Sequence, residues 1–381
     1  MGNTYTNEPA FINRKKEVQF LNNWVKERSK NLLFVYGPKS SGKTTLLYRL
    51  INNEWKDNRK FDVKHINLRT ILISNYNSFI QTFFNIDYSK DKSDVKEKRE
   101  YNAKVFKLTV ETFKGIDEKL LDPFEVMEQE LKLLNKKGIK PIIVIDELQA
   151  LENIYMTDQR ELLKELFNFF VSITKETHLA HVIVASSDGY FIERIYNESK
   201  LKKTSEFLEI DYLDENDVKY WLDNLEKESA ITEYTLTNDQ KRMIWENFGG
   251  SVSEISRFLG DILMRAEKGK VPEDDFNEIL NRKLIAARSQ FVDYADIGFE
   301  SKEEILFEEI YEKIKEKDYF TSSEFSGLIK DDCFKDKNEL KSALIELVRQ
   351  NFISYNPVTA EYKLQGKSME IGLKMYVEMQ S

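Results

Sequence analysis

Residues 31 to 45 constrain the fold more than any other stretch of the chain. They read Asn-Leu-Leu-Phe-Val-Tyr-Gly-Pro-Lys-Ser-Ser-Gly-Lys-Thr-Thr. The apolar run from Leu32 to Tyr36 has the length and the β-branched and aromatic content of a buried strand. A helical pattern of leucine and isoleucine follows at 46 to 51, and the turn between the two reads G-x-x-x-x-G-K-T. A strand, this turn and a helix in that order predict a phosphate-binding loop.

Each residue type in this loop has a chemical reason. Gly37 and Gly42 let the backbone bend until successive N–H groups converge on phosphate oxygens, and the positive end of the following helix adds to that field. Lys43 can reach the β- and γ-phosphates, and the Thr44 hydroxyl can ligate Mg²⁺. We therefore expect a nucleoside triphosphate to be bound by Gly37, Pro38, Lys39, Ser40, Ser41, Gly42, Lys43, Thr44 and Thr45.

A second informative stretch lies about 100 residues further on and reads Lys140-Pro-Ile-Ile-Val-Ile-Asp-Glu-Leu-Gln-Ala-Leu151. Four consecutive apolar residues predict a strand that is buried on both faces and delivers Asp146 and Glu147 at its C-terminal end. Open α/β sheets bind ligands at that edge. We expect Asp146 to hold Mg²⁺ through water, as a Walker-B aspartate does, and Glu147 to orient and deprotonate the attacking water.

Two weaker candidates accompany these motifs. The predicted strand from His181 ends in Ser186 and Ser187, and one of these hydroxyls, Ser187 in our assignment, fits a sensor of the γ-phosphate. A simple strand-to-helix turn explains the two serines equally well. Arg14 precedes a helical pattern and is a candidate for contacting the adenine and ribose, with a solvated basic residue as the alternative.

The order of elements predicts the fold. Strands alternate with helices from 31 to 210, which predicts an α/β P-loop NTPase core with a parallel sheet sandwiched by helices and right-handed crossovers. From Asp211 the β signal disappears, and helices are expected near 214 to 225 and at 237–247, 251–267 and 273–294. Three further helices, the last at 337–350, precede a β-hairpin. We therefore expect a P-loop core at 1–210, an all-helical module at 211–295 and a winged helix-turn-helix at 296–381.

Composition excludes several classes of protein. The 381 residues include 41% apolar and 32% charged residues, as in a helix-rich globular chain of two or three domains. No run approaches the roughly 18 apolar residues of a membrane span, and the N-terminus lacks signal-peptide features, so we expect a cytoplasmic protein. The single Cys333 excludes an internal disulfide, and three histidines do not favour a multi-histidine metal site. A net charge of −9 argues against a protein that coats nucleic acid.

With both motifs, the segment Phe11-Ile-Asn-Arg14-x-x-Glu17 and the two C-terminal modules, the chain resembles the archaeal ATPase family. That family is a branch of the AAA+-like and STAND P-loop NTPases. The resemblance implies ATP binding and hydrolysis with Mg²⁺, a sheet with the phosphate-loop strand in a central position, and a helical lid that closes over the nucleotide.

The chain departs from the family pattern at two places. Relatives carry Gly-Gly-x-Pro in the lid, where this chain has Gly249-Gly250-Ser251-Val252. Relatives also tend to place an arginine before the fifth strand, where this chain has Lys200, Lys202 and Lys203, and no arginine lies between Arg194 and Arg242. Lysine lacks the planar fork of arginine, so activation by an arginine finger across a ring is disfavoured, and Arg194 is only a weak substitute.

Three functions fit these observations. The first is an ATPase that acts as a conformational switch, with the lid and winged helix passing its state to a protein partner. The second is a DNA-binding regulator, but residues 296–381 hold 12 basic and 18 acidic residues, and DNA affinity depends largely on neutralising phosphates. The acidic charge therefore disfavours DNA. The third is a nucleotide-bound scaffold with negligible turnover, against which both intact motifs argue. Arg257 in the predicted lid is a further candidate for reaching the nucleotide, or a surface arginine.

Overall fold

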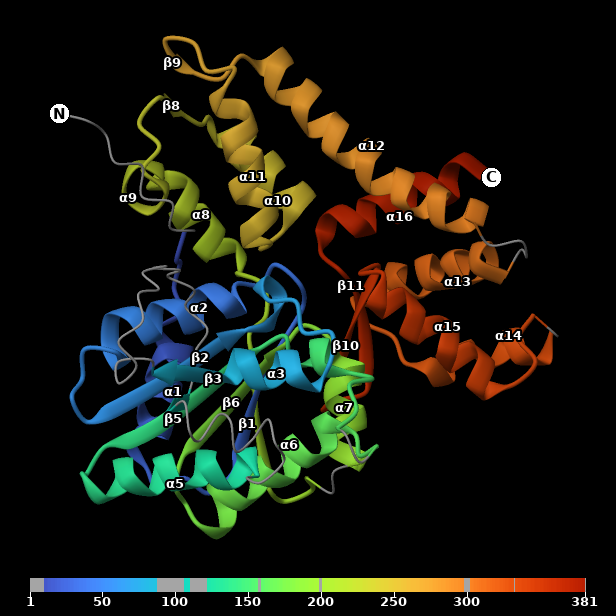
Figure 1. The fold of residues 1–381 in the computed structure, drawn as a ribbon. Helices are drawn as coiled ribbons and strands as arrows, with labels where there is room; N and C mark the ends of the chain where they lie inside the picture. The colour runs from blue at the N-terminus through green and yellow to red at the C-terminus, as the bar shows by residue number, and fades with distance from the viewer. Residues whose placement is uncertain are drawn as a thin grey trace.

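Five strands between residues 32 and 209 pair in parallel. In the computed structural model, which describes residues 10–87, 106–109, 122–156, 159–198, 201–297, 302–331 and 333–380, they form one sheet (Figure 1). Their spatial order is β2 (Phe61–Asn67), β5 (Lys140–Asp146), β6 (His181–Ser186), β1 (Leu32–Tyr36) and β7 (Ser205–Glu209). The predicted parallel sheet is confirmed. The strand β1 has a neighbour on each side, and β6 separates it from β5.

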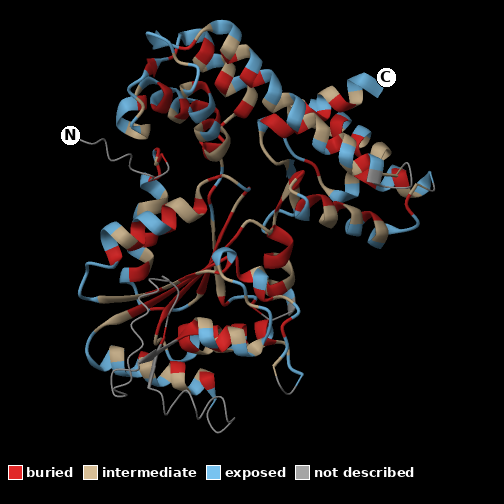
Figure 2. Cartoon of the chain, turned by 45° about the horizontal axis from the view of Figure 1, so that its top comes forward, coloured by how far each residue is buried: buried red, intermediate tan, exposed pale blue. Residues whose placement is uncertain are grey.

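Helices cover both faces of this sheet, because alternate residues of its inner strands point to opposite sides. Leu33 and Val35 of β1 pack with the helices α1 (Lys15–Lys26) and α2 (Lys43–Leu50). Leu32 and Phe34 point to the other face, where α3 (Tyr76–Phe83), α5 (Pro123–Lys136), α6 (Leu162–Val171) and α7 (Gly189–Glu198) lie. The inner strands are consequently buried along most of their length (Figure 2).

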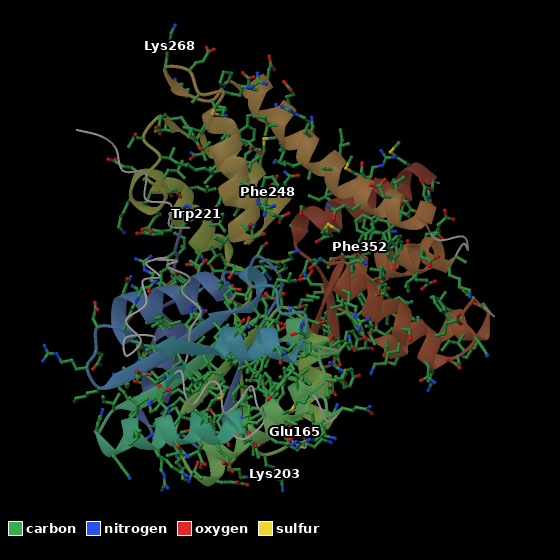
Figure 3. The ribbon with its side chains drawn as sticks, viewed as in Figure 1. Glu165, Lys203, Trp221, Phe248, Lys268 and Phe352 are labelled. Carbon is green, nitrogen blue, oxygen red and sulfur yellow. The ribbon has the colours of Figure 1, made fainter. Side chains whose placement is uncertain are left out.

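A second group of helices follows the sheet, as predicted. It consists of α8 (Glu215–Asp223), α9 (Leu225–Ser229), α10 (Asn238–Phe248), α11 (Val252–Leu263) and the first half of α12 (Glu273–Ile297). Trp221 and Phe248 lie in its core (Figure 3). We call this group of helices the lid. Ala10 and Ile12 also pack into its core, so the segment before α1 packs with the lid rather than with the sheet.

The C-terminal part has the expected winged-helix elements. The helices are α13 (Lys302–Glu316), α14 (Ser326–Lys330) and α15 (Lys337–Arg349), and the antiparallel hairpin is β10 (Ile353–Asn356) with β11 (Glu361–Leu364). Their shared core contains Phe352, labelled in Figure 3. None of the described helices is both long and apolar enough to cross a membrane.

Two short strand pairs and the last helix were not predicted from the sequence. One pair is formed by β8 (Tyr234–Thr235) and β9 (Gly269–Lys270). The other parallel pair is formed by β3 (Phe84–Asp87) and β4 (Phe106–Thr109). The last helix, α16 (Lys367–Gln380), lies along α12 (Figure 1). Because α12 contributes Phe276 to the lid core and Phe291 to the winged-helix core, the division of the chain at 295 stays a prediction.

The crossing of α12 and α16 depends on Gly372. A Cβ atom at this position would lie 2.8 Å from the carbonyl carbon of Ala287, so the two helices are as close as a glycine allows. We expect Gly372→Val to separate them and to destabilise the protein by about 1–3 kcal/mol, the usual cost of overpacking. Thermal unfolding measures the effect.

Gly260 provides the matched control. It lies within α11, and a Cβ atom there would have no neighbour within 4 Å. Gly260→Ala should leave the unfolding temperature unchanged or raise it slightly, because alanine favours the helix. If Gly372→Val unfolds at the same temperature as the parent chain, the α12–α16 contact does not contribute to stability.

Candidate active site

The register of the sheet brings the predicted residues to one edge. Tyr36, the last residue of β1, pairs with Ser186, the last of β6, and with Glu209, the last of β7. Asp146 at the end of β5 pairs with Ala185 of β6. All four strands therefore end at the same level, and their C-terminal residues and following loops meet there.

The loop after β1 bends as its glycines predict. Gly37 has a φ of 144° and Gly42 a φ of 96°, and α2 begins directly after Gly42. A Cβ atom on Gly37 would lie 2.1 Å from the carbonyl oxygen of Ile210, so only glycine fits between the loop and the end of β7. Ser40, between the two glycines, also has a positive φ of 67°. Positive φ angles of this kind produce the tight loop curvature that is typical of backbone anion-binding sites.

Lys43 is buried under this loop. Its ammonium donates hydrogen bonds to the carbonyl oxygens of Gly37 at 2.9 Å and Pro38 at 2.8 Å. Burial lowers the pKa of Lys43 to about 8, while the nearby carboxylates of Glu147 and Asp146 oppose that shift. The lysine is thus held at the loop by acceptors that a phosphate group can replace.

A pair of oxygen ligands lies beside the lysine. The Thr44 hydroxyl donates to Oδ2 of Asp146 at 2.6 Å. Asp146 is 1% exposed, and its Oδ1 is buried with no hydrogen-bond partner in the part of the chain that the structure describes. A buried carboxylate oxygen without a donor, next to a hydroxyl, fits a hard cation such as Mg²⁺.

Glu147, directly after β5, adopts a left-handed conformation with φ of 62°. Its two carboxylate oxygens accept from Nη2 of Arg69 and from Nε2 of Gln149. Burial raises the pKa of Glu147, and the positive charge of Arg69 works against that rise. Sequence reasoning missed both partners. Arg69 follows β2, the neighbour of β5, and this adjacency is the signal that could have identified it.

The two candidate serines differ in position. Ser186 is fully buried; its hydroxyl donates to Oε1 of Gln149 at 3.0 Å and accepts the N–H of Asp188 at 3.0 Å. Ser187 lies one residue beyond β6 and is partly exposed. Hydrogen bonds thus join Ser186 through Gln149 to Glu147, whereas Ser187 stays a prediction.

Arg14 is buried, and its guanidinium group forms hydrogen bonds and an ion pair with groups of the protein. Its Nη2 donates to the carbonyl oxygens of Ser41 and Asp211, both at 2.7 Å, and its Nη1 lies 3.1 Å from Oε1 of Glu17. It therefore ties the N-terminal segment to the phosphate loop and to the start of the lid. A contact with the base or ribose stays a prediction for this residue.

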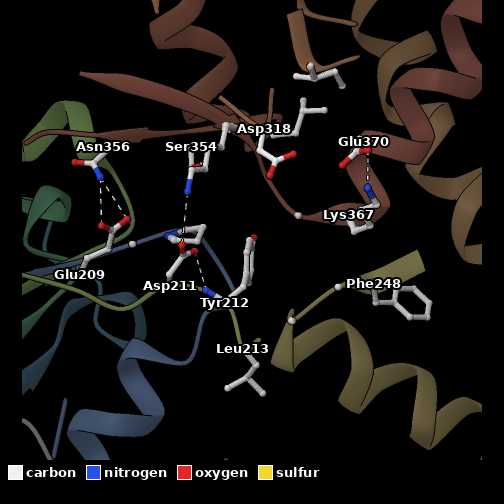
Figure 4. Close-up of a pocket in the computed structure, with 18 of the residues that line it drawn as sticks. Glu209, Asp211, Tyr212, Leu213, Phe248, Asp318, Ser354, Asn356, Lys367 and Glu370 are labelled. Carbon is white, nitrogen blue, oxygen red and sulfur yellow. Dashed lines mark hydrogen bonds and ion pairs between the residues drawn. The ribbon is translucent and has the colours of Figure 1, made fainter. Parts of the chain in front are cut away.

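A pocket of about 520 Å³ lies between the phosphate loop, the lid and the hairpin (Figure 4). Asn356 of β10 contacts Glu209 at 3.3 Å, and Lys363 of β11 lies 3.7 Å from Asp211. On the lid side, Gly250 packs so closely on Leu213 that a Cβ atom would lie 1.9 Å from its carbonyl oxygen. Gly250 of the lid turn is therefore needed for packing even though the proline of the family pattern is missing.

The remaining residues considered in the sequence are Arg194, Arg257 and the histidines. Arg194 forms an ion pair with Glu152 of the same chain, and Arg257 is exposed on α11. His181 packs edge-on against Trp24, and burial lowers its pKa to about 4, in keeping with a structural role. No cluster of metal-ligating side chains is found among the residues described.

The sequence pattern of an ATPase domain found predominantly in archaea matches residues 11–258. The chain belongs to this archaeal ATPase family. Two Methanocaldococcus jannaschii proteins, the uncharacterised ATP-binding proteins MJ0147 and MJECL15, are 31% and 30% identical to it; each alignment covers 93% of the chain and 94% or 96% of the relative. A third, the ATP-binding protein MJ1076, is 41% identical over 210 residues, which are 55% of this chain and 61% of that protein.

Solved structures share the fold of this family member. The Walker-type ATPase PABY2304 of Pyrococcus abyssi superposes with a TM-score of 0.61 at 17% identity, covering 96% of both chains. The ORC2 protein of Aeropyrum pernix gives 0.51 at 10% identity, covering 98% of this chain and 96% of that one. The α/β P-loop fold is thereby confirmed.

The close approach at Gly37 can be tested by substitution. We expect Gly37→Ala to weaken binding of a fluorescent ATP analogue about tenfold or more, because the methyl group collides with Ile210 and the loop must open. Gly138→Ala is the control, since Gly138 also has a positive φ, 72°, but no atom within 4 Å of a Cβ position. Equal affinity of Gly37→Ala and the parent chain would contradict the assigned role of the loop.

Proposed function

We propose that the protein binds ATP with Mg²⁺ and hydrolyses it at the edge of the sheet described above. The observation that carries this proposal is the meeting of four groups from two distant motifs: Lys43, Thr44, Asp146 and Glu147. The contact between Thr44 and Asp146 spans 102 residues of sequence and leaves one buried carboxylate oxygen open. Membership of an ATPase family and relatives named as ATP-binding support it.

The residues divide the chemistry among them. The loop amides and Lys43 bind the phosphates, and Lys43 exchanges its carbonyl partners for phosphate oxygens. Thr44 and Asp146 would hold Mg²⁺, whose charge stabilises the phosphate oxygens during transfer. Glu147 orients the attacking water and accepts its proton. In the present conformation Arg69 and Gln149 occupy both oxygens of Glu147, so the glutamate must exchange a partner before it can act.

We further propose that the ATPase works as a conformational switch with the lid and the winged helix as its output, acting on a protein partner. The backbone of Lys39 in the phosphate loop forms hydrogen bonds with residues next to both modules. Its carbonyl accepts from the Tyr212 hydroxyl at 3.0 Å, and its N–H donates to Gln365 at 3.3 Å. Because Tyr212 leads into the lid and Gln365 follows the hairpin, a change in the loop reaches both modules directly.

The activity is tested with Glu147→Gln. This variant should bind ATP with near-parental affinity and hydrolyse it roughly 10²- to 10⁴-fold more slowly, because the amide cannot accept the proton. Steady-state phosphate release and binding of a fluorescent analogue measure the two effects. Glu165→Gln on α6 is the control and should leave both unchanged. A chelator of Mg²⁺ should abolish turnover of the parent chain. A parent chain that binds no nucleotide would refute the proposal.

A DNA-binding function is the second candidate, and the acidic charge of the winged helix argues against it. In addition, Lys341 and Arg349 of α15 line a pocket together with residues of α7, so this side of α15 faces the ATPase core. At low salt we expect no tight, steeply salt-dependent retardation of duplex DNA in a gel-shift assay. Such retardation would favour the DNA-binding reading.

A further inference from the structure

The helix that a winged helix places in the DNA major groove has another neighbour in this protein. α15 faces α7 of the ATPase core across a pocket of about 330 Å³. The core side presents three carboxyl groups, Glu152, Asp188 and Glu193, and one cation, Arg194, which pairs with Glu152. The core wall therefore carries an excess of negative charge, whereas α15 presents Lys341 and Arg349.

These opposite charges are close enough to attract. Nζ of Lys341 lies 3.9 Å from Oε2 of Glu193 and 5.7 Å from the ring centre of Tyr190. Burial raises the pKa of Asp188 and of Glu152, and the positive charges of Arg349 and Arg194 oppose that rise at both carboxyl groups.

Tight apolar packing holds the two parts together next to these charges. The ring of Tyr190 on α7 stacks on that of Tyr355 on β10, with centres 4.2 Å apart and planes 4° from parallel. A Cβ atom on Gly189 would lie 2.0 Å from the carbonyl oxygen of Tyr355, so the start of α7 fits flush against the hairpin. Figure 1 shows α7 beside β10. The contact is a built interface rather than a chance approach of two charged surfaces.

The interface is also connected to the proposed catalytic edge. Asp188 donates its N–H to the hydroxyl of Ser186, which donates to Gln149, which donates to Glu147. A second connection runs along the chain, because Glu152 follows Glu147 by five residues and forms an ion pair with Arg194 of α7. These bonds connect Glu147 and Ser186 to the chain segments that carry Asp188 and Glu152.

We propose that the acidic wall of this pocket, formed by Glu152, Asp188 and Glu193, is the surface on which the ATPase core retains α15, and that occupancy of the γ-phosphate position loosens it. The inference rests on the proposed function, since it requires ATP in the phosphate loop. The partner of α15 is then the ATPase core of the same chain. The basic side of α15 is thereby engaged until the catalytic edge changes state.

Amide hydrogen exchange of the full-length protein tests the retention. Exchange over 187–194 and 337–349 is measured without nucleotide, with ADP and with a non-hydrolysable ATP analogue. In the parent chain we expect about two- to fivefold faster exchange with the ATP analogue than with ADP, which matches the weak to moderate strength of partly exposed ion pairs. Glu193→Lys and Lys341→Glu should each speed exchange in the ADP state by a similar factor, and the two together should restore protection.

Lys337→Glu is the matched control, because Lys337 is exposed at the start of the same helix. It should leave exchange unchanged. Equal protection of α15 in all nucleotide states, or charge reversals without effect and without mutual rescue, would overturn the inference. Binding of a fluorescent ATP analogue is measured on the same samples. If the analogue binds and α15 does not respond, the inference fails and the ATPase proposal stands; if nothing binds, both fail.

Discussion

The parallel pairing of β1 with β6, and of β6 with β5, is the interaction on which the site depends. Because Tyr36 pairs with Ser186 and Asp146 pairs with Ala185, the loops after the three strands start at one level. Lys43, Thr44, Asp146 and Glu147 then need only short loops to meet. A register shift of one residue would turn Asp146 to the other face of the sheet and separate it from Thr44.

A second set of contacts joins this edge to the rest of the molecule. The backbone of Lys39 forms hydrogen bonds with Tyr212 and Gln365. Arg14 donates to the carbonyl oxygens of Ser41 and Asp211. Gly37 packs directly against Ile210. The phosphate loop is therefore surrounded by the N-terminal segment, the lid linker and the hairpin. Any ligand that moves the loop must act on all three, which gives the proposed switch a physical basis.

Much of this arrangement follows from local sequence. The phosphate loop and the strand before Asp146 have patterns that few other structures satisfy, and both sit where they were predicted. The last helix, α16, was not predicted. Its face toward α12 is defined by Gly372 and by apolar residues whose partners lie about 80 residues earlier, so no local pattern identifies its role. Arg69 and Gln149 were missed for the same reason, since each acquires its meaning only beside Glu147.

The sequence alone determined the chemistry available to this protein. Glycine spacing, one lysine, one hydroxyl and two carboxylates at strand ends predict the phosphate-binding site with Mg²⁺ that we propose, because backbone conformation and ligand type are local properties. The tertiary structure decided what surrounds that site. Whether α15 is exposed or faces α7 depends on two surfaces more than 140 residues apart in sequence, Glu193 against Lys341 and Tyr190 against Tyr355. Long-range charge and shape complementarity of this kind has no periodicity along the chain, and only the folded molecule reveals it.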